Sequence, residues 1–290
     1  MGKSRLAKYL IIIGILLIFF TIMLFSAGIF ESENPPGDKL ALIEINGTIV
    51  NSSEIIDEIK KYKDDKSVKA IVLRIDSPGG IVAPTQEIYE ELNKVDKKII
   101  ASMGASATSG GYYIACSADR IFANPGTLTG SIGVRMNFPR IVELSKKIGI
   151  DSETIKSGQY KDSGSAYRYF TPEEKKLFQD MIDDVYNQFV DAVYNGRKHA
   201  KLTKEQIIKI ADGRVMSGRQ ALQYKLVDEL GNLEDAIHYA AKISGIEGKP
   251  KIARKKPRTT LFERFISQSF GNKISDIIKD QVSIRYEIPF

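Results

Sequence analysis

The amino-acid sequence predicts an α/β domain with a largely parallel sheet, preceded by one apolar N-terminal helix. Apolar, β-branched runs are typical of buried strands and lie at Leu40–Val50, Ala70–Asp76 and Ile99–Met103, with weaker ones at Ile121–Ala123 and Glu153–Lys156. Amphipathic stretches around 53–64 and 83–95 separate the first three runs. Because strands that alternate with helices form right-handed βαβ crossovers, we expect these strands to lie parallel.

The second half of the chain is predicted to be helical. Thr171–Glu174 combines an N-cap, a proline at the first helical position and a glutamate at the third, and apolar residues then recur at four-residue steps. Thr203 opens a short helix, Ser217 begins another, and 233–244 forms a fourth. One long helix and three shorter ones are therefore expected.

Residues 10–30 form a charge-free apolar run. A helix of this length, at about 1.5 Å per residue, spans a hydrocarbon core of roughly 30 Å. Basic residues precede the run and glutamates follow it, which predicts a single-pass anchor with the N-terminus in the cytoplasm and the body outside. A cleaved signal peptide is the alternative, but Ser26-Ala27-Gly28 is a poor cleavage site. The predicted divisions are a cytoplasmic N-terminus at 1–9, a transmembrane helix at 10–30, a linker at 31–39, a folded domain at 40–248, and a basic linker with a C-terminal tail at 249–290.

Positive charge is concentrated outside the predicted domain. The net charge is +6, but residues 1–9 and 249–258 carry more positive charge than this, so the remainder is slightly acidic. A slightly acidic body argues against a phosphate-binding face, and no nucleic-acid partner is expected. The single Cys116 cannot form an intramolecular disulfide and is predicted to be a small buried residue.

A serine stands at a predicted strand-to-helix junction. The strand at 99–103 leads into a turn rich in small residues, and Ser109-Gly110-Gly111 precedes an apolar helix beginning near Tyr112. Unpaired backbone N–H groups and the helix dipole favour negative charge there, which suits a nucleophile. The structural alternative is that small residues only let the helix pack closely on the sheet. Ser102 and Ser106 compete with Ser109 but lack the two following glycines.

A nucleophilic serine needs a base, and the sequence offers histidine or lysine. His199 and His238 lie in amphipathic helical contexts, far from any acidic partner that the sequence places, so both are expected to be surface or core residues. A lysine with an ordinary pKa near 10.4 is almost fully protonated at neutral pH, so burial must lower that pKa by roughly 2 to 3 pH units. Lys156 and Lys161 both qualify, and their positions alone do not separate them.

A second glycine turn follows the strand that ends at Asp76. The turn is Asp76-Ser77-Pro78-Gly79-Gly80, and its glycines let the backbone approach a ligand closely. Their N–H groups are able to stabilise a developing oxyanion. Taken alone, this is a common turn.

Five segments stand out in this order: DSPGG at 76–80, ATSGGYY at 107–113, ANPGTLTGSIG at 123–133, IKSGQYKD at 155–162 and ADGRVMSGRQALQYKLVDELG at 211–231. Together they resemble signal peptide peptidase A, also called protease IV, of the Clp-protease/crotonase superfamily. The resemblance covers roughly residues 40–245. It implies a Clp-protease/crotonase-like fold of repeated ββα units with a helical C-terminal half.

The resemblance also implies a serine endopeptidase with a Ser/Lys dyad. By its motifs, Ser109 is the nucleophile, Lys161 the general base, and Ser131 a hydroxyl that holds the lysine amine. The backbone amides of Gly80 and Gly110 form the oxyanion hole. No metal or other cofactor is implied.

The chain resembles the short, single-copy form of the family. One subunit of that form makes only part of a substrate channel, which implies a ring-like homo-oligomer with inward-facing sites. The implied substrates are apolar peptides, including remnant signal peptides, at the outer face of the cytoplasmic membrane. Ala166 departs from the family, which usually has proline there.

The predicted anchor and the glycine loops bear on three other functions. A Clp-like membrane protease would cleave a dedicated membrane-protein partner. A crotonase-type acyl-CoA enzyme is disfavoured, because the predicted domain is outside the membrane and no acidic catalytic residue lies near either glycine loop. A non-enzymatic scaffold is disfavoured because the active-site segments are intact.

The C-terminal tail carries an amphipathic pattern behind its basic stretch. The apolar residues at helical spacing are Leu261, Phe262, Phe265, Ile266 and Phe270. Such a helix would lie on an anionic membrane surface, on a neighbouring subunit or on its own domain. The sequence leaves these three alternatives open.

Overall fold

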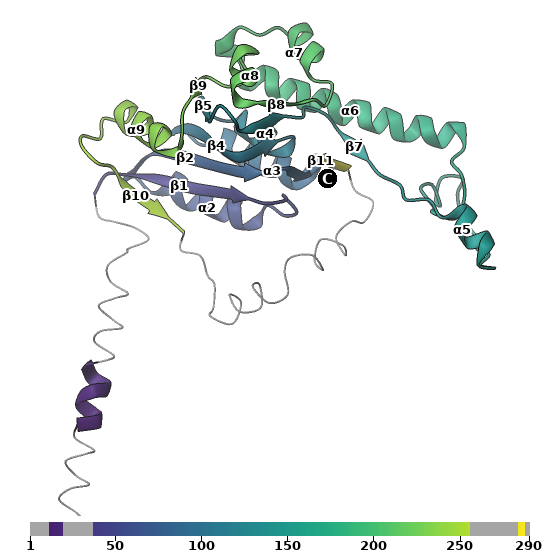
Figure 1. The fold of residues 1–290 in the computed structure, drawn as a ribbon, viewed down its shortest axis with the longest axis horizontal. Helices are drawn as coiled ribbons and strands as arrows, with labels where there is room; N and C mark the ends of the chain where they lie inside the picture. The colour runs from purple at the N-terminus through teal and green to yellow at the C-terminus, as the bar shows by residue number, and fades with distance from the viewer. Residues whose placement is uncertain (1–11, 20–36, 256–283, 288–290) are drawn as a thin grey trace, which may run out of the picture.

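The computed structural model describes residues 12–19, 37–255 and 284–287 (Figure 1). Residues 12–19 are helical, and the rest of the predicted membrane span at 10–30 lies outside the described residues. The predicted amphipathic tail segment at 261–270 also lies outside them. Within the described ranges, no helix is both long enough and apolar enough to cross a bilayer.

The main sheet has eight strands and is parallel except at one pair. Its order along the main path is β10 (Lys251–Arg254), β1 (Lys39–Asn46), β2 (Val68–Ser77), β4 (Lys98–Thr108), β5 (Arg120–Ala123) and β9 (Glu229–Leu230). Off this path, β6 (Leu128–Gly130) pairs parallel with the end of β4, and β8 (Val215–Ser217) pairs antiparallel with β6. The predicted α/β fold with a largely parallel sheet is confirmed.

Both faces of this sheet are covered, which is why its strands are almost continuously apolar. On one face Leu42, Val72 and Ile100 pack against α9 (Leu233–Ile243). The other face forms the larger core, beneath α2 (Ser53–Asp64), α3 (Val82–Asn93) and α4 (Gly110–Ala115). In Figure 1, α9 and the pair α2 and α3 lie on opposite sides of the strands.

The helices of the second half begin where the sequence predicts. They are α6 (Pro172–Gly196), the 3-10 turn η1 (Lys198–Ala200), α7 (Lys204–Ile210), α8 (Gly218–Gln223) and α9. Thr171, Thr203 and Ser217 each accept a hydrogen bond from the third helical N–H, and the side chain at that position bonds back. These capping boxes satisfy backbone donors that have no intrahelical partner.

Two segments differ from the sequence prediction. The strand expected at Glu153–Lys156 is wrong: these residues are irregular and exposed, and Ile155 is 97% exposed, so no neighbouring strand is there to pair with them. Lys251–Arg254, inside the predicted basic linker, forms β10 beside β1 in parallel register. The alternation of this short segment buries Ala253 while its basic neighbours remain exposed.

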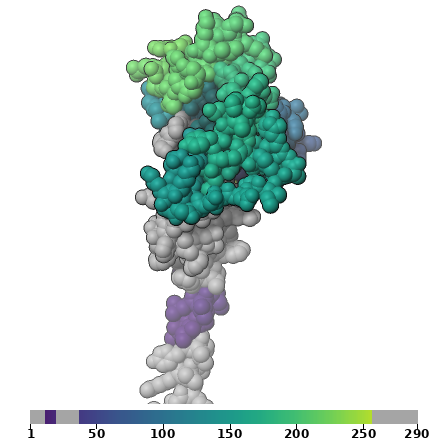
Figure 2. Space-filling model, turned by 90° about the vertical axis from the view of Figure 1, so that its right-hand side faces the viewer, coloured from purple at the N-terminus to yellow at the C-terminus, as the bar shows by residue number. Residues whose placement is uncertain are grey.

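A projection that we call the arm, residues 137–185, extends from the body. It contains α5 (Val142–Lys147) and the first half of α6, and Figure 1 shows both reaching away from the sheet. Figure 2 views the molecule from this side, where the arm stands in front of the body. Rings of Phe138, Phe170 and Phe178 lie with centroids 4.5 to 5.5 Å apart and form the core of the arm.

A second, three-stranded antiparallel sheet lies beside the main one. Its order is β3 (Gly79–Ile81), β11 (Ile284–Glu287) and β7 (Arg135–Met136). β3 follows β2 after Pro78 and contains both glycines of the predicted turn, and β7 leads into the arm. The described part of the C-terminus therefore lies between these two strands.

Candidate active site

Ser109 is the single residue between strand β4 and helix α4. Its backbone has φ 53° and ψ −116°, a conformation that costs a non-glycine residue about 1 to 3 kcal/mol and persists only where the surroundings impose it. The side chain stands at the N-terminal end of α4, where the first N–H groups lack intrahelical acceptors. The predicted strand-to-helix junction is confirmed.

The second glycine after Ser109, Gly111, has a packing role. A Cβ on Gly111 would lie 3.0 Å from the Ser77 carbonyl oxygen, so the small residue lets α4 approach the end of β2. The competing serines occupy different positions. Ser102 lies within β4, where its hydroxyl accepts a hydrogen bond from Arg74, and Ser106 also precedes the junction.

Ser131 lies beside Ser109. The parallel register pairs Thr108 with Gly130, and the Ser109 N–H donates to the Gly130 carbonyl at 2.8 Å. The Ser131 N–H donates to the Arg214 carbonyl at 2.8 Å, and Ser131 also has a positive φ, of 50°. Paired parallel strands keep their residues in register, so Ser109 and Ser131, which follow the paired Thr108 and Gly130, occupy neighbouring positions at the ends of β4 and β6.

Gly80 lies on β3, one of the strands that contact α4. A Cβ at this position would lie 2.1 Å from the Ile49 carbonyl oxygen, so no other residue fits without moving the backbone. The Gly79 carbonyl accepts from the Ile49 N–H, and the Ile81 N–H donates to the Ile49 carbonyl. Since backbone groups alternate along a strand, the N–H of Gly80 points to the opposite edge, away from Ile49.

Within one chain, Lys161 lies away from Ser109, Ser131 and Gly80. It lies in an exposed turn of the arm, where its N–H donates to the Gly158 carbonyl. The turn is attached to the first part of α6, because the Ser163 hydroxyl donates to Glu174. The other end of α6 packs on α4 through Phe189 and Tyr113. At about 1.5 Å per residue, Glu174 and Phe189 on α6 are roughly 20 Å apart.

The turn that carries Lys161 is held by a network of charges. Arg168 forms hydrogen bonds with Asp162 and with Glu174. The hydrogen bonds from Arg168 lower the pKa of the Glu174 carboxyl to about 2, with a further contribution from the Thr171 N–H. The carboxylates therefore stay ionised at neutral pH and keep their charge-assisted bonds to Arg168.

The competing lysine, Lys156, is bound into this network. Its amine lies 2.6 Å from Asp162 and also donates to the Gln159 carbonyl. Hydrogen bonds from Arg168 and then from Lys156 lower the pKa of Asp162. Lys161, in contrast, forms no ion pair with any residue that the structure describes. The Lys156 amine is thus occupied by bonds within the turn, whereas the Lys161 amine is not paired with a carboxylate there.

His199 has an acidic partner that the sequence did not place. Its Nε2 lies 2.9 Å from Asp228, which also pairs with the buried Arg197. Burial raises the pKa of Asp228, but the hydrogen bonds and charge of Arg197, together with hydrogen bonds from His199 and the Ile121 N–H, outweigh burial and hold the pKa below its ordinary value. Neighbouring Gly196 packs on Cys116, at the opposite end of α4 from Ser109. His199 is therefore not placed to act on Ser109.

Cys116 is buried, as the sequence predicts. Burial raises the pKa of its thiol to about 12, so it stays protonated at neutral pH. Thiols in that state are poor nucleophiles. Cys116 therefore does not compete with Ser109.

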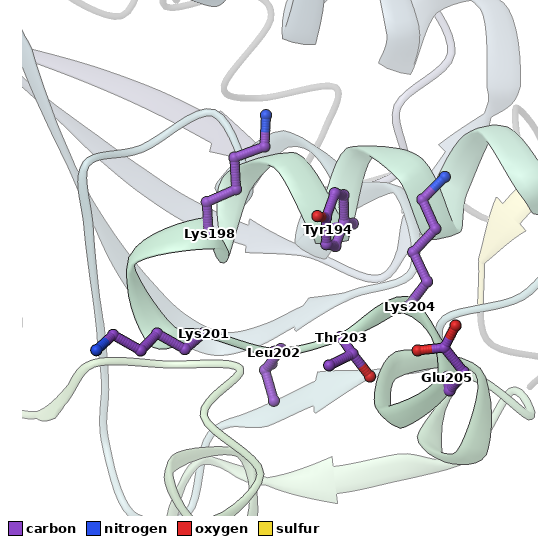
Figure 3. Close-up of a pocket in the computed structure, with 7 residues that line it drawn as sticks. All are labelled: Tyr194, Lys198, Lys201, Leu202, Thr203, Lys204 and Glu205. Carbon is purple, nitrogen blue, oxygen red and sulfur yellow. The ribbon is translucent and has the colours of Figure 1, made fainter.

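Two hollows in the described part of the chain exceed 300 Å³. One, of about 330 Å³, is lined by Ser131, residues 133–135, Tyr186 and residues 211–213, and so adjoins the serine pair. The other, of about 430 Å³, lies at the junction of α6 and α7 (Figure 3). In Figure 3 the amines of Lys198, Lys201 and Lys204 point in different directions and do not converge on one point. Of these two, the first is the candidate for substrate side chains, because Ser131 lines it.

The chain matches two protein families. Residues 91–247 match peptidase family S49, which is more than half of the chain. Residues 41–137 match the N-terminal domain of NfeD1b.

Several curated proteins are similar. A protein of Synechocystis sp. named as protease slr0021 is 43% identical over 72% of this chain and 76% of its own length. One of Enterococcus faecium named as signal peptide peptidase SppA is 33% identical over 84% of this chain and 74% of its own length. Serine protease SPPA of Arabidopsis thaliana chloroplasts is 34% identical, over 77% of this chain but 36% of its own length. The chain therefore belongs to the signal peptide peptidase A proteins of peptidase family S49 and is a serine-type peptidase.

Proposed function

We propose that this peptidase is a Ser/Lys endopeptidase that cleaves apolar peptides, including remnant signal peptides. The observation that carries the proposal is the constrained junction at Ser109, with Ser131 beside it and with β3, which carries Gly80, in contact with α4. A hydroxyl, a second hydroxyl and backbone donors are thus gathered at the start of one helix. These groups match what acyl transfer needs.

In the proposed reaction the neutral amine of Lys161 takes the proton from the Ser109 hydroxyl. The Ser109 oxygen then attacks the peptide carbonyl carbon, and the N–H groups of Gly80 and Gly110 stabilise the resulting oxyanion. When the C–N bond breaks, the proton passes from Lys161 to the leaving amine. A water molecule, deprotonated by the same amine, then hydrolyses the acyl-enzyme. The Ser131 hydroxyl holds the lysine amine in place.

The lysine in this proposal comes from a second copy of the chain. Within one copy, Glu174 holds the turn with Lys161 and Phe189 packs on α4, and these two residues of α6 are roughly 20 Å apart. This distance is beyond the length of a lysine side chain. The arm also exposes large apolar side chains, a feature of surfaces that bind another protein. These are Leu144, Ile148, Ile150, Ile155, Tyr160, Tyr167, Tyr169, Leu177 and Met181. Burying them on a neighbouring copy would bring each Lys161 towards the next Ser109, and repetition of one such contact gives a ring.

The apolar run at 10–30 supports a membrane anchor, with the peptidase domain outside the cytoplasmic membrane. Tethering raises the concentration of the enzyme beside peptides that remain in the bilayer. We expect the full chain to stay with membranes after alkaline carbonate extraction, and a chain that begins at residue 37 to be released. Equal release of both chains would contradict the anchor.

A serine-reactive fluorophosphonate tests the nucleophile. We expect the full chain to form one covalent adduct, located at Ser109 by peptide mass spectrometry, because Ser109 is the residue at the N-cap of α4. The Ser109→Ala variant should not react. Ser106→Ala is the matched control, since Ser106 lies three residues earlier, and it should react as the unchanged chain does.

Two results would contradict the assignment. Labelling that persists in Ser109→Ala would show another nucleophile. Hydrolysis of an apolar peptide by Ser109→Ala at the unchanged rate would exclude Ser109 from the reaction.

A further inference from the structure

Strand β4 changes partners a few residues before Ser109. It lies between β2 and β5 in the main sheet (Figure 1). Its register with β5 ends at Met103, and its register with β6 begins at Ser106. Gly104 and Ala105 therefore lie at the point where one neighbouring strand ends and the next begins.

The same stretch is irregular on the side of β2. The register there passes from Met103 to Ala107 on β4, while β2 advances past a single residue, Asp76. Residues 104–106, which we call the bulge, thus lie opposite Asp76 alone. A bulge bends its strand, and bulges are common next to active sites, where they re-aim a side chain. The position of Ser109 therefore depends on what holds the bulge.

Two side chains bind the main chain of the bulge, one from each side of β4. The half-buried Asp76 carboxylate accepts a hydrogen bond of 3.0 Å from the Ser106 N–H. On the other side, the hydroxyl of Thr127, which directly precedes β6, donates to the Gly104 carbonyl at 2.7 Å. Thr127 is 2% exposed, so this bond is shielded from water. The two bonds hold the bulge where the strand registers are interrupted.

Neither bond requires a charge. The Ser106 N–H is a neutral donor, so an amide oxygen at position 76 would accept from it as the carboxylate does. Likewise, another hydroxyl side chain at position 127 would donate to the Gly104 carbonyl. A Cβ on Gly104 would lie 2.7 Å from the Asp76 Cγ, so the glycine gives the Asp76 side chain room to reach the bulge.

We propose that Asp76 and Thr127 are positioning residues, which hold the bulge and thereby fix the place of the Ser109 hydroxyl. The inference rests on the proposed function, since that function makes Ser109 the nucleophile. Only Ala107 and Thr108 separate the bulge from Ser109, whose backbone conformation persists only where its surroundings impose it. A displacement of about 1 Å at a reacting group costs on the order of a hundredfold in rate.

A pair of substitutions at Thr127 tests the inference by kinetics. Thr127→Val has nearly the same shape but no hydroxyl, so the Gly104 carbonyl loses its donor. We expect kcat for an apolar peptide to fall at least about tenfold with KM unchanged, because the Ser109 hydroxyl is displaced while the substrate contacts remain. Thr127→Ser keeps the hydroxyl and is the matched control, so it should keep the kcat of the full chain.

Asp76 supplies a second pair of variants on the opposite side of β4. Asp76→Ala removes the acceptor, and we expect the same loss of kcat at unchanged KM. Asp76→Asn keeps an acceptor oxygen and should retain the kcat of the full chain. Because Asp76 is half-buried, this pair decides the inference even if Thr127→Val does not fold. A residue that acted through its charge would lose activity in both variants.

Hydrogen exchange separates this inference from the proposed function, because it needs no catalysis. In the Ser109→Ala background, Asp76→Ala and Thr127→Val should speed exchange of the backbone amides of residues 104–109 at least about tenfold, while α9 exchanges at its original rate. Asp76→Asn and Thr127→Ser should leave both segments unchanged. Absence of hydrolysis in every chain with Ser109 would count against the proposed function alone, and the exchange result would still decide the inference.

Three results would overturn the proposal. One is the same kcat in Asp76→Ala, Thr127→Val and the full chain, when all three hydrolyse the peptide. Another is a loss of kcat in Asp76→Asn equal to that in Asp76→Ala. The third is unchanged exchange of residues 104–109 in both Asp76→Ala and Thr127→Val.

Discussion

Replacing Lys161 by alanine is expected to reduce kcat for an apolar peptide by at least about a thousandfold, because the Ser109 hydroxyl loses its general base. The reduction should appear in kcat/KM as well, since the amine acts on the transition state and not on substrate binding. Steady-state hydrolysis of a fluorogenic apolar peptide measures both constants. Labelling by fluorophosphonate should slow in parallel, because it needs the same activated oxygen.

The matched control for this prediction is Lys156→Ala. Lys156 lies in the same turn and pairs with Asp162 at the surface of the arm, where such an ion pair contributes about 1 kcal/mol or less. We expect Lys156→Ala to keep kcat within about tenfold of the unchanged chain. A thousandfold loss in Lys156→Ala with little loss in Lys161→Ala would reverse the assignment of the base.

Mixed assemblies of two inactive variants are expected to recover activity. If one copy supplies Ser109 and the next copy supplies Lys161, a site is complete where a Lys161→Ala copy donates its serine and a Ser109→Ala copy donates its lysine. In a random mixture of equal parts this holds for on the order of one quarter of the sites. The measurement is peptide hydrolysis by co-expressed variants with different affinity tags, purified through both tags.

The control for this mixture pairs Ser109→Ala with the double variant Ser109→Ala/Lys161→Ala. No site in that mixture has a serine, so it should stay inactive at the same protein concentration. If assemblies that contain both Lys161→Ala and Ser109→Ala copies stayed inactive, each dyad would have to form within one chain. The arm would then have to move towards its own Ser109.

Much of the fold could be predicted because local signals agree with the tertiary structure. Buried parallel strands leave continuous apolar runs, and capping residues mark the starts of α6, α7 and α8. The strand predicted at Glu153–Lys156 failed because its residues suit a strand but have no partner in the arm. The sequence of β10 is typical of a charged linker. A short edge strand buries few side chains, here Ala253, so it needs few apolar residues and leaves a weak pattern.

Only part of the site could be predicted, because some of its residues belong to one local motif and others are brought together from distant parts of the chain. Ser109 and its glycines belong to one local motif, and the structure places them at the expected junction. The proximity of Ser131 depends on the pairing of β4 with β6, which no local pattern reveals. The contact of His199 with Asp228 likewise joins separate elements. The separation of Lys161 from Ser109 follows from the direction of α6, which sequence periodicity does not give.

Helix α6 connects the arm to the nucleophile as one piece. It runs from Pro172 to Gly196 with no glycine or proline between these ends, so it has no built-in hinge. One end holds the turn with Lys161 and the other packs on α4. If each arm docks on the next copy to form a ring, a stiff α6 makes the rotation between neighbouring subunits the same at every interface. The number of subunits would then be decided by the angle at which a single helix leaves the sheet, and a kink placed at its middle would change the size of the ring.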